Sequence, residues 1–202
     1  MEILKREVWI EKIIPAFIFF ALWIDGWLLP LILVPIFYVL MIEKKNLGWL
    51  GFSKHELGYS LFLSLIITGC LIAIYYPIFF HYLPYTLGKE DIDIYTVFSD
   101  VFHYPVYEEI AYRSFVLIHF AKLDSSPLSN RNLILNLTQS LLFVSIHKHH
   151  FSQPLILIPV FLLGLLNGLL FLKTKNIYGC IFSHSILNGF ALLLLNAVTA
   201  RW

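Results

Sequence analysis

The sequence predicts an all-α protein, a polytopic transmembrane helical bundle of six to seven spans with a four-helix core in its C-terminal half. Hydrophobic residues make up 59% of the chain and charged residues only 13%. The mean hydropathy of +0.78 is far from that of a soluble domain. Aromatic residues reach 17%, which suits lipid-facing helices with anchors at the membrane surface. The apolar residues also gather in seven segments, each near the length of a membrane span.

These seven segments define the predicted helices in order. They cover residues 10–24, 27–42, 57–80, 98–121, 131–148, 154–172 and 177–199. A transmembrane helix needs about 20 residues, so the third and the seventh segments are predicted to be complete spans. The first two are shorter and are separated by Asp25-Gly26, which favours a hairpin of marginal spans.

The basic residues predict how the chain crosses the membrane. With seven spans and the N-terminus inside, the inside segments hold ten of the fourteen Lys and Arg, the outside segments three, and one span holds Arg113. This distribution follows the positive-inside rule. Lys5, Arg6 and Lys12 precede the first segment without a small-residue cleavage site, which favours a retained helix over a signal peptide. We expect a multi-pass integral membrane protein with a cytoplasmic N-terminus. The small size favours a prokaryotic cell membrane.

The net charge and the cysteines argue against a nucleic-acid partner, a disulfide framework and a thiolate metal site. The net charge of +1 argues against a nucleic-acid partner. Cys70 and Cys180 both lie in apolar segments, so neither a disulfide framework nor a thiolate metal site is predicted.

The fourth segment carries the first polar motif, Glu108-Glu109-x-x-x-Arg113. Ionisable groups inside a membrane are costly and point to function. On a helix, Glu109 and Arg113 are i, i+4 neighbours and are predicted to pair. Glu108 is rotated by about 100° from Glu109 and has no local partner, so it suits a general base or acid. Upstream, Pro105 is predicted to kink the helix. A structural ion pair or an ion-pathway carboxylate is the alternative interpretation.

Two further motifs follow, Phe143-x-x-x-His147 and His184-x-x-x-Asn188. His147 is suited to proton sharing with a carboxylate or to holding a water. Its i, i+3 spacing to His150 allows a metal site as an alternative, although no His-Glu-x-x-His pattern accompanies it. His184 and Asn188 share a helix face and could stabilise an oxyanion, or could serve as hydrogen bonds between helices.

Other intramembrane protease chemistries lack their residues here. Gly51-Phe52-Ser53, the nearest approach to a serine nucleophile turn, lies in a loop, and no pair of intramembrane aspartates is present. The zinc motif His-Glu-x-x-His is missing. A glutamate with two histidines remains.

The ordered motifs resemble the CAAX protease and bacteriocin-processing (CPBP) family of glutamic intramembrane proteases. The signature of that family is Glu-Glu-x-x-x-Arg, then Phe-x-x-x-His, then His-x-x-x-Asn or Asp, each on a successive core helix. Here the motifs follow at spacings of 34 residues from Arg113 to His147 and 37 from His147 to His184. The resemblance covers residues 95–199 and leaves residues 1–90 as N-terminal helices of unassigned role. Ser114 departs from the Gly that members often carry there.

The resemblance implies a metal-independent intramembrane protease without a cofactor. Glu108 and His147 would activate a water, His184 and Asn188 would form the oxyanion hole, and Glu109 and Arg113 would support the site or position the substrate. The substrate would be a membrane-associated protein or peptide, such as a prenylated CAAX terminus, a bacteriocin leader, a pheromone or a sorting tag.

Two other functions remain open from the sequence. One is a non-catalytic member that binds a membrane partner, for example in immunity or regulation, and the other is a proton-coupled transporter in which Glu108 and His147 relay protons.

The predicted segments place His147 and His184 at different depths in the membrane. As the segments are drawn, His147 lies near the outer end of its helix and His184 nearer the inner end. We therefore expect the fifth span to enter the membrane later than residue 131.

Overall fold

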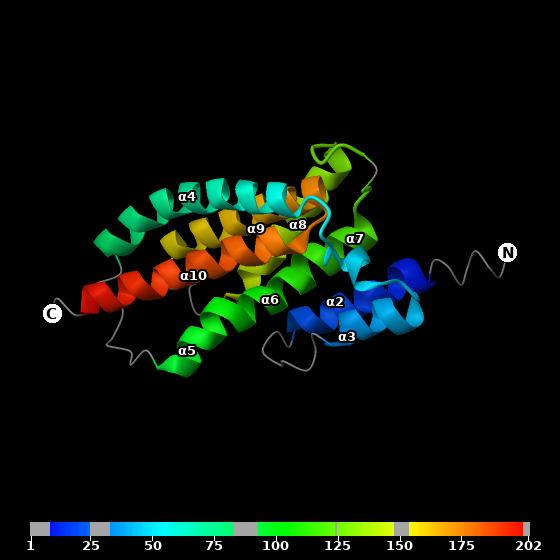
Figure 1. Ribbon diagram of the computed structural model, residues 1–202, viewed down its shortest axis with the longest axis horizontal. Helices are drawn as coiled ribbons and strands as arrows, with labels where there is room; N and C mark the ends of the chain where they lie inside the picture. Colours follow the sequence, from blue (N-terminus) through cyan, green and yellow to red (C-terminus); the bar gives the residue numbers. More distant parts are fainter. Residues whose placement is uncertain (1–8, 25–32, 83–92, 124, 148–153, 200–202) are drawn as a thin grey trace.

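The computed structural model describes residues 9–24, 33–82, 93–123, 125–147 and 154–199. Throughout these ranges the regular structure is helical and includes no strand, which confirms the predicted all-α class. The long helices lie nearly side by side along one axis (Figure 1).

The helices follow the predicted segments closely. Helices α4 (Leu57–Tyr82), α9 (Pro154–Thr174) and α10 (Ile177–Thr199) match the third, sixth and seventh segments. Helix α8 (Asn130–Ile146) matches the fifth. The first two segments give shorter pieces: π-helix η1 (Trp9–Ile13) and helix α2 (Ile14–Ile24), then helix α3 (Leu33–Phe37) and π-helix η3 (Tyr38–Ile42).

The fourth segment forms one continuous helical run, Ile94–Phe120, that alternates between α- and π-helix. Its parts are α5 (Ile94–Phe98), η6 (Ser99–His103), α6 (Tyr104–Glu108), η7 (Glu109–Phe115) and α7 (Val116–Phe120). Asp93 caps its start by accepting a hydrogen bond from the backbone N–H of Thr96 at 2.7 Å. We call this run the α5–α7 run.

Three of the described helices are long and apolar enough to cross a membrane: Leu57–Ile78, Pro154–Thr174 and Ile177–Leu194. The first described helical stretch is Trp9–Ile24 and the second is Leu33–Ile42, and both are shorter than the about 20 residues that a span needs. The described parts of the first two segments are thus too short to be complete spans, and the Asp25-Gly26 break between them lies outside the described residues.

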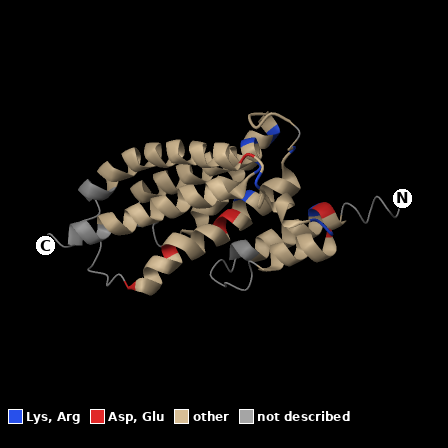
Figure 2. Ribbon diagram, viewed as in Figure 1, with Lys and Arg blue, Asp and Glu red and all other residues tan. Residues whose placement is uncertain are grey.

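Packing brings the C-terminal helices together. Helix α10 packs against α4 and α9, α8 packs against α9, and the α5–α7 run packs against α10. The short α2 lies beside the C-terminal part of the α5–α7 run, and α3 packs against α2 (Figure 1). The basic residues gather at the end of the bundle where α4 and α8 begin and α9 ends (Figure 2). Acidic residues also lie along the α5–α7 run (Figure 2).

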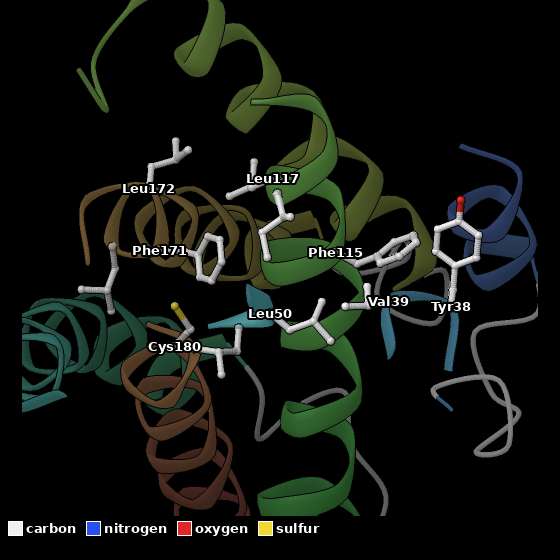
Figure 3. Close-up of a cluster of buried hydrophobic side chains, with 11 residues drawn as sticks. Tyr38, Val39, Leu50, Phe115, Leu117, Phe171, Leu172 and Cys180 are labelled. Carbon is white, nitrogen blue, oxygen red and sulfur yellow. The ribbon is translucent and has the colours of Figure 1, made fainter. Parts of the chain in front are cut away.

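A loop between the N-terminal hairpin and α4 is inserted into this bundle. Its 3-10 helix η4 (Leu47–Leu50) places Leu50, fully buried, among Phe115, Phe171 and Cys180 (Figure 3). Gly51, with φ of 87°, then turns the chain, and its carbonyl accepts the backbone N–H of Ile177 at 3.1 Å. Residues far apart in sequence therefore share one hydrophobic core.

A buried polar cluster fastens the N-terminal helices to the α5–α7 run. His119 is buried, and its Nε2 lies 3.0 Å from Oε1 of Glu43, which is almost fully buried as well. Lys12 donates to the carbonyl of His119, and Tyr38 donates to the carbonyl of Ile10. Both ring nitrogens of His119 thus have hydrogen-bond partners in the core, since Nδ1 lies 2.7 Å from the Phe115 carbonyl.

Candidate active site

The first two site residues stand where the helix type changes. Glu108 ends α6, and Glu109 begins the π-helix η7. Pro105 has no backbone N–H to donate, and the π-turn that precedes it has the Tyr104 N–H bonded to the Ser99 carbonyl. A π-helical stretch thus lies directly upstream of Pro105, and the kink expected at this residue stays a prediction. Such stretches often mark functional sites.

Glu109 and Arg113 form the predicted ion pair. Arg113 Nε lies 3.3 Å from Glu109 Oε2, and neither side chain is exposed. The Arg113 guanidinium also stacks on the Phe143 ring, 4.0 Å from its centroid. The pairing expected from the i, i+4 spacing is confirmed. Because both charges are buried, each depends on the other for compensation.

His184 lies between the two adjacent carboxylates. Its Nδ1 is 2.8 Å from Glu109 Oε1, and its Nε2 is 3.6 Å from Glu108 Oε2. Glu109, anchored by Arg113, therefore fixes the orientation of the imidazole and directs Nε2 toward Glu108. The sequence grouped Glu108 with His147 and did not predict that His184 also lies beside Glu108. This contact depends on the packing of α10 against the α5–α7 run, which local spacing does not reveal.

His147 lies immediately after the end of α8. Its Nδ1 is 2.9 Å from the Phe143 carbonyl. A carbonyl can only accept, so in this contact Nδ1 carries the proton and Nε2 of the neutral ring is the acceptor nitrogen. The ring centroids of His147 and His184 lie 4.8 and 6.0 Å from that of Phe143. The two histidines therefore converge on one aromatic ring, despite their different positions along their predicted segments.

Asn188 is engaged with the backbone of the α5–α7 run. Its Nδ2 donates to the Asp100 carbonyl at 2.8 Å. An amide nitrogen carries two N–H groups, so one remains for another acceptor. Asn188 thus joins α10 to the run that holds Glu108, one helical turn after His184.

Sequence reasoning missed Asn167, in the middle of α9. It is fully buried, and its Nδ2 donates to the Cys180 carbonyl at 3.1 Å. Its amide also lies near the Glu109 carboxylate. The signal was present, because Asn167 is the only polar side chain between Pro154 and Leu172.

The metal alternative concerned His147 and His150. His150 lies outside the described residues. In the part of the chain that the structure describes, no three His, Cys, Asp or Glu side chains gather in a way that could hold a metal ion.

Comparison with known proteins adds one finding. Residues 91–190 match the model of the type II CAAX prenyl endopeptidase Rce1-like family, a range that contains all three motifs. No curated protein and no solved structure matches the chain significantly. The match describes a family of proteases, and it agrees with a chain that contains apolar helices of membrane-spanning length. Over residues 91–190, this chain belongs to the type II CAAX prenyl endopeptidase Rce1-like family, in agreement with the CPBP resemblance of its motifs.

Proposed function

We propose that this protein is an intramembrane glutamic endopeptidase that hydrolyses a peptide bond of a membrane-associated protein or peptide. The observation that carries the proposal is the placement of His184, whose two ring nitrogens face Glu109 at 2.8 Å and Glu108 at 3.6 Å. The buried Glu109–Arg113 pair holds one side of this arrangement. The other carboxylate, Glu108, is the group assigned to the chemistry.

The proposed reaction begins with a water beside Glu108 and His147. Glu108 takes a proton from the water as its oxygen attacks the scissile carbonyl carbon, and the carbonyl oxygen becomes an oxyanion. The tetrahedral intermediate then collapses, the C–N bond breaks, and Glu108 returns the proton to the leaving amine. No acyl-enzyme forms, and neither a metal nor a cofactor takes part in these steps.

The remaining residues have supporting roles in this proposal. His184 would donate to the oxyanion from Nε2 in its doubly protonated form, because its Nδ1 proton already faces Glu109, and the second N–H of Asn188 would be the other donor. Support for Asn188 comes from the Asp100 contact, which uses only one of its two N–H groups. His147 would accept from the attacking water, because its Nδ1 is bonded to the Phe143 carbonyl. Glu109 and Arg113 would support the site and position the substrate.

We further infer that residues 95–199 form the catalytic core, in which the α5–α7 run, α8, α9 and α10 are the four core helices. The α5–α7 run and α8 would then also lie in the membrane. With the N-terminal helices of residues 1–90, these give a bundle of six to seven spans. The N-terminus would be cytoplasmic and the membrane prokaryotic. A prenylated CAAX peptide is the first substrate to test, because the matching family is described as CAAX prenyl endopeptidases.

The decisive experiment is peptide cleavage by purified variants in liposomes. The assay uses an internally quenched farnesylated peptide ending in a CAAX sequence, with an unprenylated peptide and a bacteriocin leader peptide as further substrates. Glu108→Gln keeps the size of the side chain but removes the base, so turnover should be abolished while the protein stays folded. Glu43→Gln is the matched control, since Glu43 is also a nearly buried carboxylate beside a histidine but belongs to another cluster.

The outcomes separate the candidate functions. Loss of cleavage in Glu108→Gln with retention in Glu43→Gln supports the glutamic mechanism. Near-normal turnover by Glu108→Gln, or complete loss of wild-type cleavage in a chelator, would overturn it. If the wild type cleaves none of the peptides, the chain acts as a binding partner or transporter instead.

A further inference from the structure

The amide of Asn167 lies where three helices of the site meet. It comes from α9, which carries none of the three motifs, and it is fully buried. One partner is the Cys180 carbonyl on α10, at 3.1 Å. The amide also lies near the Glu109 carboxylate on the α5–α7 run.

The bond to Cys180 reaches the backbone turn that carries His184. Helix α10 is α-helical at this point, so the Cys180 carbonyl is also the acceptor for the backbone N–H of His184, four residues later. In return, Cys180 Sγ lies 3.4 Å from the Asn167 carbonyl. The contact is therefore reciprocal, and it holds α9 and α10 together one turn before the histidine.

The same turn of α9 is also held from its other side. Asn136 of α8 donates to the Leu165 carbonyl at 2.9 Å, and Gln139 donates to the Gly164 carbonyl at 3.1 Å. Gly168 makes this approach possible, because a Cβ atom there would meet Asn136 Oδ1 at 1.7 Å. Neither bond involves the Asn167 amide, so the contacts between α8 and α9 can be tested separately from the contacts that Asn167 makes toward α10.

We propose that Asn167 is a positioning residue of the catalytic site, whose amide sets the orientation of the Glu109–His184 pair by bonding to the Cys180 carbonyl while lying near the Glu109 carboxylate. This inference rests on the proposed function. Asn167 does not touch the reacting atoms. It acts through the turn of α10 that carries His184, and thereby on the alignment of Nδ1 with Glu109 and of Nε2 with Glu108. A purely structural interhelical hydrogen bond is the competing explanation.

The test compares Asn167→Ala and Asn167→Ser with Asn136→Ala in the cleavage assay on the farnesylated peptide. Asn136→Ala is the matched control, because it removes a buried amide that also donates to a carbonyl between the helices. Hydrogen-bonded partners that orient metal-bound histidines typically contribute 10–100-fold to activity, and we expect a loss of about that size in kcat for both Asn167 variants. KM should change little, and Asn136→Ala should keep its kcat. Asn167→Ser adds neither bulk nor charge, so it replaces Asn167→Ala in the comparison if the alanine variant does not fold.

A second readout needs no substrate. The imidazole ¹⁵N resonances of His184, identified by their loss in His184→Gln, should shift in Asn167→Ser and stay in place in Asn136→Ala. Unchanged His184 resonances together with wild-type kcat in a folded Asn167 variant would overturn the proposal. Equal losses of kcat in Asn136→Ala and the Asn167 variants would do so as well, because they would indicate general loosening of the bundle. The glutamic mechanism itself has a separate test: if the Glu108→Gln variant still cleaves the peptide, the proposed function fails whatever the Asn167 variants show.

Discussion

Glu108 and Glu109 are adjacent in sequence but are held by different surroundings. Glu109 is fully buried between Arg113 and His184, whereas Glu108 keeps some exposure and has His184 at the longer distance of 3.6 Å. Successive residues on a helix point about 100° apart, so one faces the core and the other can face a bound substrate. We therefore expect Glu109 to orient the histidine as a fixed charge and Glu108 to exchange a proton.

Arg113→Ala should destabilise the protein as well as inactivate it. The substitution leaves Glu109 buried without its main counter-charge, and breaking a buried pair in this way typically costs about 3–5 kcal/mol. It also removes the guanidinium from the Phe143 ring. Thermal unfolding in detergent measures the effect, with Arg131→Ala as the matched control, because Arg131 is an exposed arginine at the start of α8. A folded Arg113→Ala protein with wild-type stability would contradict the buried pair.

Asn188→Ala tests whether Asn188 donates to the oxyanion or only forms a hydrogen bond between α10 and the α5–α7 run. Loss of an oxyanion donor costs about 2.7–4 kcal/mol of transition-state stabilisation, a fall of 10²–10³ in kcat. Loss of the hydrogen bond to the Asp100 carbonyl costs only about 1 kcal/mol of folding stability. We expect both effects, with KM little changed. A variant that loses stability but keeps its kcat would show that Asn188 serves only as an interhelical hydrogen bond.

At the scale of elements, the loop around η4 is bonded both to the α5–α7 run and to the start of α10. Ser114 Oγ, on the η7 segment that carries Arg113, donates to the Leu50 carbonyl at 2.6 Å. Asn176, just before α10, donates to the carbonyls of Ser53 and His55 at 2.8 and 2.9 Å. The loop thus contacts both the run with the glutamates and the helix with His184.

Gly51→Ala should dislodge this loop. Gly51 has a φ of 87°, and a Cβ atom there would lie 2.8 Å from the Phe171 ring and 3.0 Å from the backbone nitrogen of Ile177. The left-handed backbone alone costs a non-glycine residue about 1–2 kcal/mol, and the contact with backbone adds to this. Gly69→Ala is the control, because nothing lies within 4 Å of its Cβ position. In calorimetry or thermal unfolding, Gly51→Ala should have a clearly lower melting temperature than the wild type, and Gly69→Ala should not. Equal melting temperatures of the two variants would contradict the close packing of Gly51 against Phe171 and Ile177.

What the sequence could predict was local. Hydropathy located α4, α9 and α10, and the i, i+4 spacing predicted the Glu109–Arg113 pair, because these features depend on neighbours along one helix. The contact of His184 with both carboxylates was missed, since it depends on how α10 packs against the α5–α7 run. The burial of Leu50 and the Glu43–His119 pair were missed for the same reason. Asn167 was overlooked although an isolated polar residue in an apolar helix was visible.

At the scale of the whole molecule, charge is distributed along the long axis of the bundle. Lys and Arg cluster at the end where α4 and α8 begin and α9 ends, and η1 lies toward the same end (Figure 2). Helix α10 runs to the opposite end (Figure 1). A membrane protein with basic residues at one end is usually oriented with that end in the cytoplasm. The charged end and the direction of α10 both fit the proposed cytoplasmic N-terminus.

This orientation predicts opposite labelling of two introduced cysteines in intact cells. Lys54→Cys places a thiol at the basic end, just before α4, and Ile94→Cys places one at the start of the α5–α7 run, where the side chain is 84% exposed. A membrane-impermeant maleimide should modify Ile94→Cys in intact cells, because its end of the bundle faces outside. It should modify Lys54→Cys only after the membrane is opened. The parent protein, in which Cys180 is buried and Cys70 lies in the apolar α4, measures the background. The reverse labelling pattern would place the basic end outside, against the positive-inside rule.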